Sequence, residues 1–260
     1  MQLTYDRYLK ISELINLQVP LSEGPEHDET LFIIVHQIYE LWFKQLIHEL
    51  GYLQTVCVEN RPAQALSTLK RILAIFRTII QQVEVLETIS PLSFLSFRGR
   101  LDSASGFQSI QFRVIEFILG QKNPQKVSHI PKESVSYTLL NEHLHRPTLW
   151  DSFLQLLKKN NYPVPDLVLT RDVTQPYLGS TEVQTILIDI YKTNPIMMQL
   201  CEYFIDLDAA LQEWRYRHIK MVERTIGNKP GTGGSSGVNY LKGTLSAQLF
   251  PDLWAIRSSF

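Results

Sequence analysis

The chain has 260 residues, 44% of them hydrophobic, so it is long enough to bury one large core or two small ones. Its 25 basic and 26 acidic residues give a formal net charge of −1, which offers no electrostatic reason to expect a nucleic acid or an anionic membrane as partner. The most apolar stretch, residues 31–43, contains His36, Gln37 and Glu40 and is too short and too polar to span a membrane.

The N-terminal sequence MQLTYDRYLKISEL lacks the basic and apolar regions of a targeting peptide. The two cysteines, Cys57 and Cys201, lie far apart in apolar segments, so we predict free buried thiols rather than a disulfide. Both features favour a soluble cytoplasmic protein.

The first long helix is predicted from residue 28 to about residue 57, after an acidic start that suits a helix N-terminus. Phe32, His36, Tyr39 and Phe43 form one stripe along it. Apolar residues also cover its other sides, which is typical of a buried helix.

Further elements follow in order along the chain. We expect a helix at about 63–87, a short turn from Pro91, a helix over 103–120 with Gly120 as its stop, and shorter helices near 133–143 and 149–161. Residues 164–170, VPDLVLT, are the best strand candidate in a chain with few strand signals.

Two helices complete the pattern. Residues 180–194 begin with Ser and Thr and an acidic residue, as a capped helix does. Residues 195–227 contain no interior Gly, and Trp214, His218 and Met221 share a stripe with Thr225. The sequence therefore predicts an all-α fold of long packed helices.

The segment 231–237, GTGGSSG, resembles a phosphate-binding loop only superficially. A Walker loop needs a lysine before its Ser or Thr, and a dinucleotide loop needs a preceding strand, and neither requirement is met. A mobile surface linker is one interpretation of such a run. The apolar helix before it and the hydroxyl of Thr232 within it favour a functional loop instead.

The histidines and cysteines form no H-E-x-x-H, paired C-x-x-C or C-x-x-C-H motif, so neither a protein-ligated zinc site nor a covalent haem is indicated. A non-covalent haem needs only one axial histidine and an apolar slot. A lone histidine on an apolar helix is usually a hydrogen-bonded core residue. His36 and His218 each lie in an aromatic stripe on a separate long helix, but periodicity alone does not show that they face each other.

Three long segments carry a resemblance to a known family. They are HDETLFIIVHQIYELWFKQLIHEL, FRGRLDSASGFQSIQFRVIEF and WRYRHIKMVERTIGNKPGTGGSSGVNYL, and they closely resemble the tryptophan 2,3-dioxygenase family. The resemblance runs in order from YDRYL to PDLWAIR and is weakest between Asn123 and Asp172.

The resemblance implies an all-α homotetramer that binds one b-type haem per subunit. It implies a single haem-binding dioxygenase domain over residues 1–260, with residues 1–20 as an N-terminal segment packed on a neighbouring subunit. The implied reaction joins L-tryptophan and O₂ to give N-formyl-L-kynurenine by opening the indole C2=C3 bond, the first step of tryptophan degradation by the kynurenine pathway.

Site residues follow from the resemblance position by position. His218 is implied as the proximal ligand of the haem iron, and His36 as the distal histidine that contacts the indole N–H, either as a base or as a positioning group. Phe32 lines the indole pocket. Arg98 pairs with the substrate carboxylate, for which its planar fork is suited, and Thr232 contacts the amino-acid end of the substrate.

Further positions complete the implied site. Ser105 and Gly106 match a turn beside the haem. Tyr5, Tyr8 and Leu9, at i, i+3 and i+4 of a short helix, match a segment that reaches into the neighbouring subunit's pocket.

Phe94, four residues before Arg98, stands where some family members have a tyrosine that touches the carboxylate. The phenylalanine occurs in other members, so the activity is not in doubt. The carboxylate loses one donor and relies more on Arg98 and the loop.

The resemblance gives the loop after His218 a role, because its glycines permit it to fold over the substrate and exclude water. Two alternative functions remain open on the sequence: a related haem-dependent oxygenase that inserts one oxygen into an indole or other aromatic amino acid, and a haem-sensing protein without turnover. The set of Phe32, His36, Arg98 and Thr232 argues against both.

Overall fold

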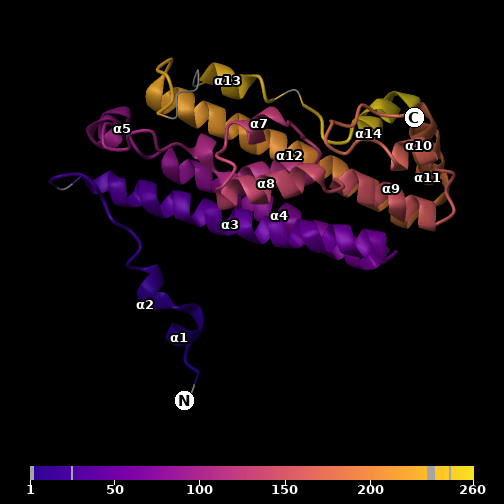
Figure 1. Ribbon diagram of the computed structural model, residues 1–260, viewed down its shortest axis with the longest axis horizontal. Helices are drawn as coiled ribbons and strands as arrows, with labels where there is room; N and C mark the ends of the chain where they lie inside the picture. Colours follow the sequence, from indigo (N-terminus) through magenta and orange to yellow (C-terminus); the bar gives the residue numbers. More distant parts are fainter. Residues whose placement is uncertain (1–2, 25, 233–237, 246) are drawn as a thin grey trace.

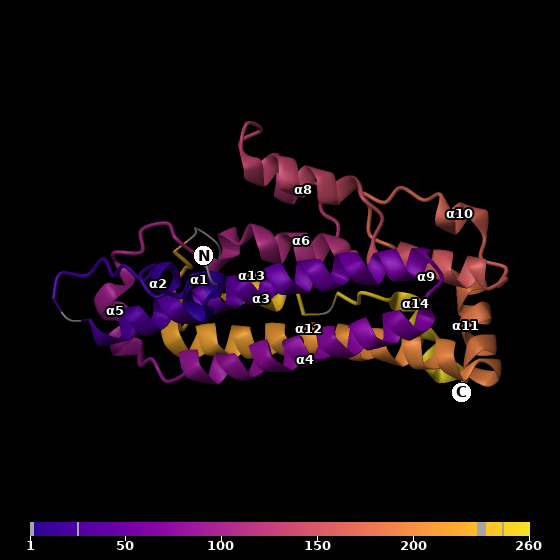
Figure 2. The ribbon, with the colours of Figure 1, turned by 90° about the horizontal axis from the view of Figure 1, so that it is seen from below.

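The computed structural model describes residues 3–24, 26–232, 238–245 and 247–260, and all regular structure within these ranges is helical. Three helices form the body of the molecule: α3 (His27–Val58), α4 (Pro62–Leu86) and α12 (Pro195–Ile226). They run side by side along the long axis, and α3 and α12 each pack against α4 (Figure 1, Figure 2). The predicted all-α class is confirmed.

Shorter helices surround this body. They are α1 (Tyr5–Leu9), α2 (Ile11–Leu14), α5 (Pro91–Arg98), α6 (Ile110–Ile118), α7 (Gln125–Ser128), α8 (Val135–His145), α9 (Leu149–Lys159), α10 (Asp166–Leu169), α11 (Thr181–Thr193), α13 (Val238–Lys242) and α14 (Pro251–Ala255), with 3-10 turns at Gly106–Gln108 and Ile256–Ser259. Helices α6 and α9 pack on α3, and α11 and α13 pack on α12. Helix α8 stands out to one side of the body and contacts α6 (Figure 2).

The helix termini follow the chemistry of their first residues. Ser180 accepts a hydrogen bond from the backbone N–H of Val183 at 3.3 Å and starts α11, as predicted. Asn194 does the same for Met197 at 3.2 Å, with Pro195 at the first helical position of α12. The predicted stop at Gly120 is confirmed within one residue, since α6 ends at Ile118 and Gly120 has φ of +99°.

Three predictions about local structure were wrong. The helix expected over 103–120 begins only at Ile110, after the 3-10 turn Gly106–Gln108. The expected turn from Pro91 is helix α5, because Ser90 caps the N–H of Ser93 at 3.0 Å and proline is well tolerated at the first helical position. The strand candidate at 164–170 contains the single helical turn α10, closed by Thr170 N–H donating to the carbonyl of Asp166 at 3.0 Å. A lone strand would have had no partner there, since the described residues form no sheet.

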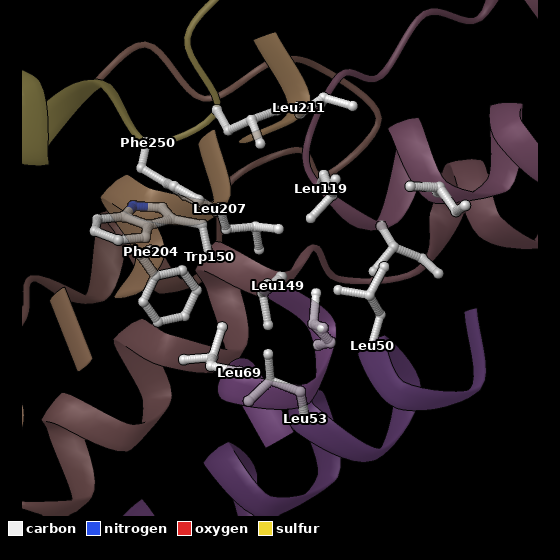
Figure 3. Close-up of a cluster of buried hydrophobic side chains, with 14 of the residues drawn as sticks. Leu50, Leu53, Leu69, Leu119, Leu149, Trp150, Phe204, Leu207, Leu211 and Phe250 are labelled. Carbon is white, nitrogen blue, oxygen red and sulfur yellow. The ribbon is translucent and has the colours of Figure 1, made fainter. Parts of the chain in front are cut away.

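The core is continuous along the bundle. Figure 3 shows the part of it in which Trp150, Phe204 and Phe250 pack together; the Trp150 ring lies 5.5 Å from that of Phe250 and 6.1 Å from that of Phe204. Cys57 and Cys201 are buried as free thiols, as predicted. This packing fixes one half of α12, so the other half can present side chains in defined positions.

The N-terminal segment leaves the body. Helices α1 and α2 extend away from the long helices (Figure 1), and Tyr5 and Tyr8 are 76% and 71% exposed. The segment is tied to α3 where buried Glu29 accepts the N–H groups of Leu21 and Ser22 at 2.7 and 3.1 Å. Within the described residues, no helix has the length and apolarity to cross a membrane.

Candidate active site between two long helices

A cavity of about 280 Å³ lies between α3 and α12 and is bordered by α5, α6 and residues near 231. The stripe expected on each long helix faces it, because Phe32, Tyr39 and Phe43 line it from α3, and Trp214 and Met221 line it from α12. Two apolar stripes that were inferred separately therefore form opposite walls of one site.

Seven of the predicted site residues are brought together here. Phe32, His36, Arg98 and Thr232 line the cavity, as do Ser105, Gly106 and His218. Tyr5, Tyr8 and Leu9 do not: they lie on α1, outside the cavity and exposed.

His218 is held in the neutral form. Burial, and secondarily the nearby His36, lowers the pKa of His218 to about 4. The described residues form no hydrogen bond to either of its ring nitrogens. A neutral imidazole with a free lone pair is the form that binds a metal.

His36 has its tautomer fixed by its own helix. The Nδ1 atom lies 2.7 Å from the carbonyl oxygen of Phe32, and because a carbonyl can only accept, Nδ1 carries the proton. Burial lowers the pKa of His36 below its usual value, against smaller opposing effects of Phe32 and Glu40. The neutral ring therefore offers Nε2 as an acceptor.

An aromatic cluster covers the end of the cavity near His36. The ring of Phe32 lies 4.1 Å from that of His36 and 5.7 Å from that of Phe94. Phe97 completes the cluster at 5.5 Å from Phe32 and 5.3 Å from Phe94. The cluster is a flat-faced apolar surface of the kind that accommodates an aromatic ring.

Two polar groups border this aromatic end. Arg98 donates from Nη2 to the carbonyl oxygen of Pro230 at 2.7 Å, and Thr232 donates its hydroxyl to the carbonyl oxygen of Ala104 at 2.7 Å. Both bonds join the segment after α12 to the opposite side of the cavity. Residues 233–237, the rest of the glycine-rich loop, lie outside the described residues.

A charged cluster that the sequence analysis missed forms part of the wall. Buried Glu116 accepts hydrogen bonds from Arg113 at 2.7 Å, Lys126 at 2.9 Å and Arg215 at 2.8 Å. Burial alone would raise the pKa of Glu116, but the three cations hold it below its usual value. Three positive charges around one carboxylate leave an excess of positive charge here.

The signal for this cluster was charged residues inside apolar helices, as in RVIEF at 113–117. Sequence spacing could not show that Arg215, about a hundred positions later in the chain, reaches the same carboxylate. The described residues contain no group of three His, Cys, Asp or Glu side chains arranged to hold a metal ion.

Comparisons with known proteins agree along nearly the whole chain. The family model described as Tryptophan 2,3-dioxygenase matches residues 1–167 and 182–260. The unmatched interval begins inside the region in which the resemblance is weakest.

Curated relatives carry the same name. A tryptophan 2,3-dioxygenase of Herpetosiphon aurantiacus is 56% identical over 256 residues, 98% of each chain. One of Anaeromyxobacter sp. is 48% identical over 99% of this chain and 96% of its own. One of Saccharopolyspora erythraea is 41% identical over 99% of this chain and 92% of its own.

Proposed function

The chain belongs to the tryptophan 2,3-dioxygenase family, and we propose that the cavity between α3 and α12 is where it oxidises L-tryptophan with O₂. Family membership makes the chain a dioxygenase, an oxidoreductase that acts on tryptophan. The proposed reaction opens the indole C2=C3 bond and places both oxygen atoms in N-formyl-L-kynurenine, the first step of tryptophan catabolism by the kynurenine pathway.

The observation that carries this assignment is the pairing of His36 and His218 across one apolar cavity. The residues fit a non-covalent b-type haem in two respects. His218 offers an unprotonated ring nitrogen, as an axial ligand must. Arg113 and Arg215 bring positive charge to the same cavity, which suits the two carboxylates of a haem.

When bound, the haem supplies the oxygen chemistry, and the protein supplies orientation and polarity. We assign His218 to the iron, with Ser105 and Gly106 beside the macrocycle. His36 would accept the indole N–H through Nε2, because its Nδ1 proton is already donated to Phe32. Phe32 would pack on the indole ring.

The other end of the substrate would meet the polar pair. Arg98 has the planar guanidinium that binds a carboxylate through two parallel hydrogen bonds. Thr232 would contact the α-amino-acid group. Because Pro230 and Thr232 already bond across the cavity edge, the segment that carries them is suited to cover bound substrate and keep water out.

The assembly is proposed on the same basis. A homotetramer of single-domain subunits over residues 1–260, with residues 1–20 docked on a neighbour, would give Tyr5, Tyr8 and Leu9 the partner surface that they lack in one subunit. A cytoplasmic location, with neither membrane nor nucleic acid as partner, suits the balanced charge.

Two histidine variants test the site. We expect His218→Ala to be purified with little haem and to regain part of it in imidazole. We expect His36→Ala to retain haem and lose about tenfold to a thousandfold in turnover, the scale of one polar contact in a catalytic site.

Haem content follows from the Soret absorbance, and product from the mass gain of two oxygen atoms. A His218→Ala protein with normal haem would refute the assignment. Haem loss in His36→Ala alone would reverse the roles of the two histidines.

A further inference from the structure

The ring of His218 lies parallel to the indole of Trp214. The two rings are 5.3 Å apart between centroids, with an interplanar angle of 5°. Trp214 precedes His218 by four residues on α12, which places both side chains on one face of the helix. A stack this close to parallel restricts rotation of the imidazole about its last side-chain torsion.

The usual device for orienting a metal-binding histidine is absent from the described residues. Such a histidine almost always donates its second ring N–H to a carboxylate, a carbonyl or water. No described protein group forms a hydrogen bond to His218, whereas the stack with Trp214 is a direct contact with its ring. Among the described residues, the Trp214 indole is therefore the group placed to orient the plane of the His218 imidazole.

Trp214 is itself fixed by two other helices. Its ring lies 4.8 Å from that of Phe112 on α6, and it meets Phe43 and Tyr39 on α3 edge to face at 6.1 and 6.4 Å. The Tyr39 hydroxyl in turn donates to the carbonyl of Ile79 on α4 at 3.1 Å. The indole plane is thus determined by the packing of the bundle and not by α12 alone.

A tryptophan is not needed here for filling space alone. Trp214 is 9% exposed, and its indole N–H forms no hydrogen bond of normal geometry with the described residues, although it lies near enough to the Tyr39 hydroxyl to affect the pKa of that group. A phenylalanine would bury apolar surface without leaving a donor unmatched. The larger ring offers more surface for stacking on the imidazole.

We propose that Trp214 is a positioning residue for His218, which transmits the arrangement of α3 and α6 to the plane in which the imidazole presents its metal-binding nitrogen. The inference rests on the proposed role of His218 as haem ligand. Its consequence is a ligand that is oriented before the haem binds, so that little rotational freedom is lost on binding and the haem is released slowly.

The experiment uses haem-loaded full-length protein. Trp214→Met removes the planar ring that stacks on His218 but keeps a large apolar side chain, and Trp214→Phe keeps an aromatic ring. The readouts are the iron–histidine stretching band of the ferrous protein in resonance Raman spectra and the rate of haem transfer to excess apomyoglobin. Trp150 provides a matched control, because it is 1% exposed and does not line the cavity, and its indole N–H, like that of Trp214, lies near a tyrosine hydroxyl without a hydrogen bond of normal geometry.

We expect Trp214→Met to shift and broaden the band and to speed haem transfer by about ten- to a hundredfold, the usual effect of removing a group that orients a metal ligand. Trp214→Phe should restore most of both values. Trp150→Met should lower stability and leave the band unchanged. A wild-type band and transfer rate in Trp214→Met, or equal changes in Trp150→Met, would overturn the proposal.

If Trp214→Met does not fold, Phe112→Leu tests the same proposal. This substitution removes the α6 ring that packs on the Trp214 indole and leaves α12 unchanged. A broadened band in that variant supports the proposal, and an unchanged band overturns it. The role of His218 is tested separately. If His218→Ala keeps its haem, the proposed function fails. If His218→Ala loses its haem but the Trp214 variants have the wild-type band and transfer rate, only the positioning role of Trp214 is refuted.

Discussion

Arg98 contacts a backbone carbonyl in the place where a substrate carboxylate is expected to bind. Its Nη2 atom donates to Pro230 at 2.7 Å, so substrate binding would exchange a neutral acceptor for a charged one. A carboxylate carries the opposite charge and can accept two parallel hydrogen bonds from the guanidinium, whereas the Pro230 carbonyl accepts one, which favours the exchange. Substrate capture and movement of the segment near Pro230 are therefore expected to be linked.

Substrate choice should depend on this arginine. Tryptamine lacks the carboxylate and so forgoes the two charge-assisted hydrogen bonds with Arg98, which should cost a few kcal/mol, or about a hundredfold or more in kcat/KM. Ring-fluorinated tryptophans keep the clamp and should remain fair substrates. Arg98→Ala should lower the ratio of kcat/KM for tryptophan to kcat/KM for tryptamine.

The control is Arg100→Ala, which removes an exposed arginine two residues away that does not line the cavity. Its tryptophan-to-tryptamine ratio should match that of the wild type. An unchanged ratio in Arg98→Ala would mean that Arg98 is structural and that another group holds the carboxylate.

Among the elements, α8 depends on a buried lysine. Lys122 is 4% exposed and its Nζ atom donates to the carbonyls of Leu144 and Arg146 at 3.1 and 3.0 Å and also to that of His143. These carbonyls lie at the C-terminal end of α8, where helix carbonyls have no partner within the helix. The lysine therefore anchors the projecting α8 to the segment after α6.

This lysine should give the protein a pH-dependent stability. Burial lowers the pKa of Lys122 to about 8, below its ordinary value of 10.5. The unfolded chain therefore keeps the Lys122 proton to higher pH than the folded chain does. As a result, the contribution of Lys122 to stability rises as the pH increases from about 8 to 10.5, and it is smallest below pH 8. The difference in unfolding free energy between wild type and Lys122→Met should grow by about 1 kcal/mol from pH 7 to pH 9.

Urea unfolding at the two pH values measures this difference. At both values Lys122→Met should be less stable than the wild type, because the carbonyls lose their donor. Lys132→Met removes an exposed lysine from the nearby loop and is the control. The difference between its unfolding free energy and that of the wild type should not change with pH. A pH-independent effect of Lys122→Met would show that Lys122 keeps its charge throughout this range.

At the scale of the whole molecule, the N-terminal segment is an exposed apolar surface. Helices α1 and α2 have five and four residues, too short to be stable without packing, yet Tyr5, Tyr8 and Leu9 are 76%, 71% and 42% exposed. A neighbouring subunit would bury them. The active site would then be completed by two chains.

Deleting residues 1–12 should therefore lower turnover strongly while most of the haem is retained. Light scattering gives the assembly state, and the Soret absorbance gives the haem content. Glu13→Ala, an exposed change on α2 that leaves Tyr5 and Tyr8 in place, is the control and should behave as wild type. A truncated monomer with full activity would contradict the proposal.

Mixed assemblies sharpen this test. Truncated subunits retain His218, and full-length His218→Ala subunits retain the N-terminal segment. If the segment completes a neighbour's site, dissociating and reassembling the two inactive proteins together should restore part of the activity. Restoration should not occur when each protein is reassembled alone.

The sequence by itself determined the helices and their faces. Periodicity located α3, α4 and α12 to within about two residues, because apolar spacing is a local property of the chain. It also placed His36 and His218 in aromatic stripes. It failed at α5, where the Ser90 cap begins a helix in place of the expected turn, and at α10, where one helical turn stands in place of the expected strand.

Only the tertiary structure decided which stripes meet. The cavity between α3 and α12 exists because both helices pack against α4, and no spacing within one helix specifies that arrangement. The Glu116 cluster and the packing of Trp214 against Phe43 of α3 and Phe112 of α6 were decided in the same way. Contacts between residues far apart in sequence depend on how helices cross, whereas a one-dimensional pattern records only which side of each helix is apolar.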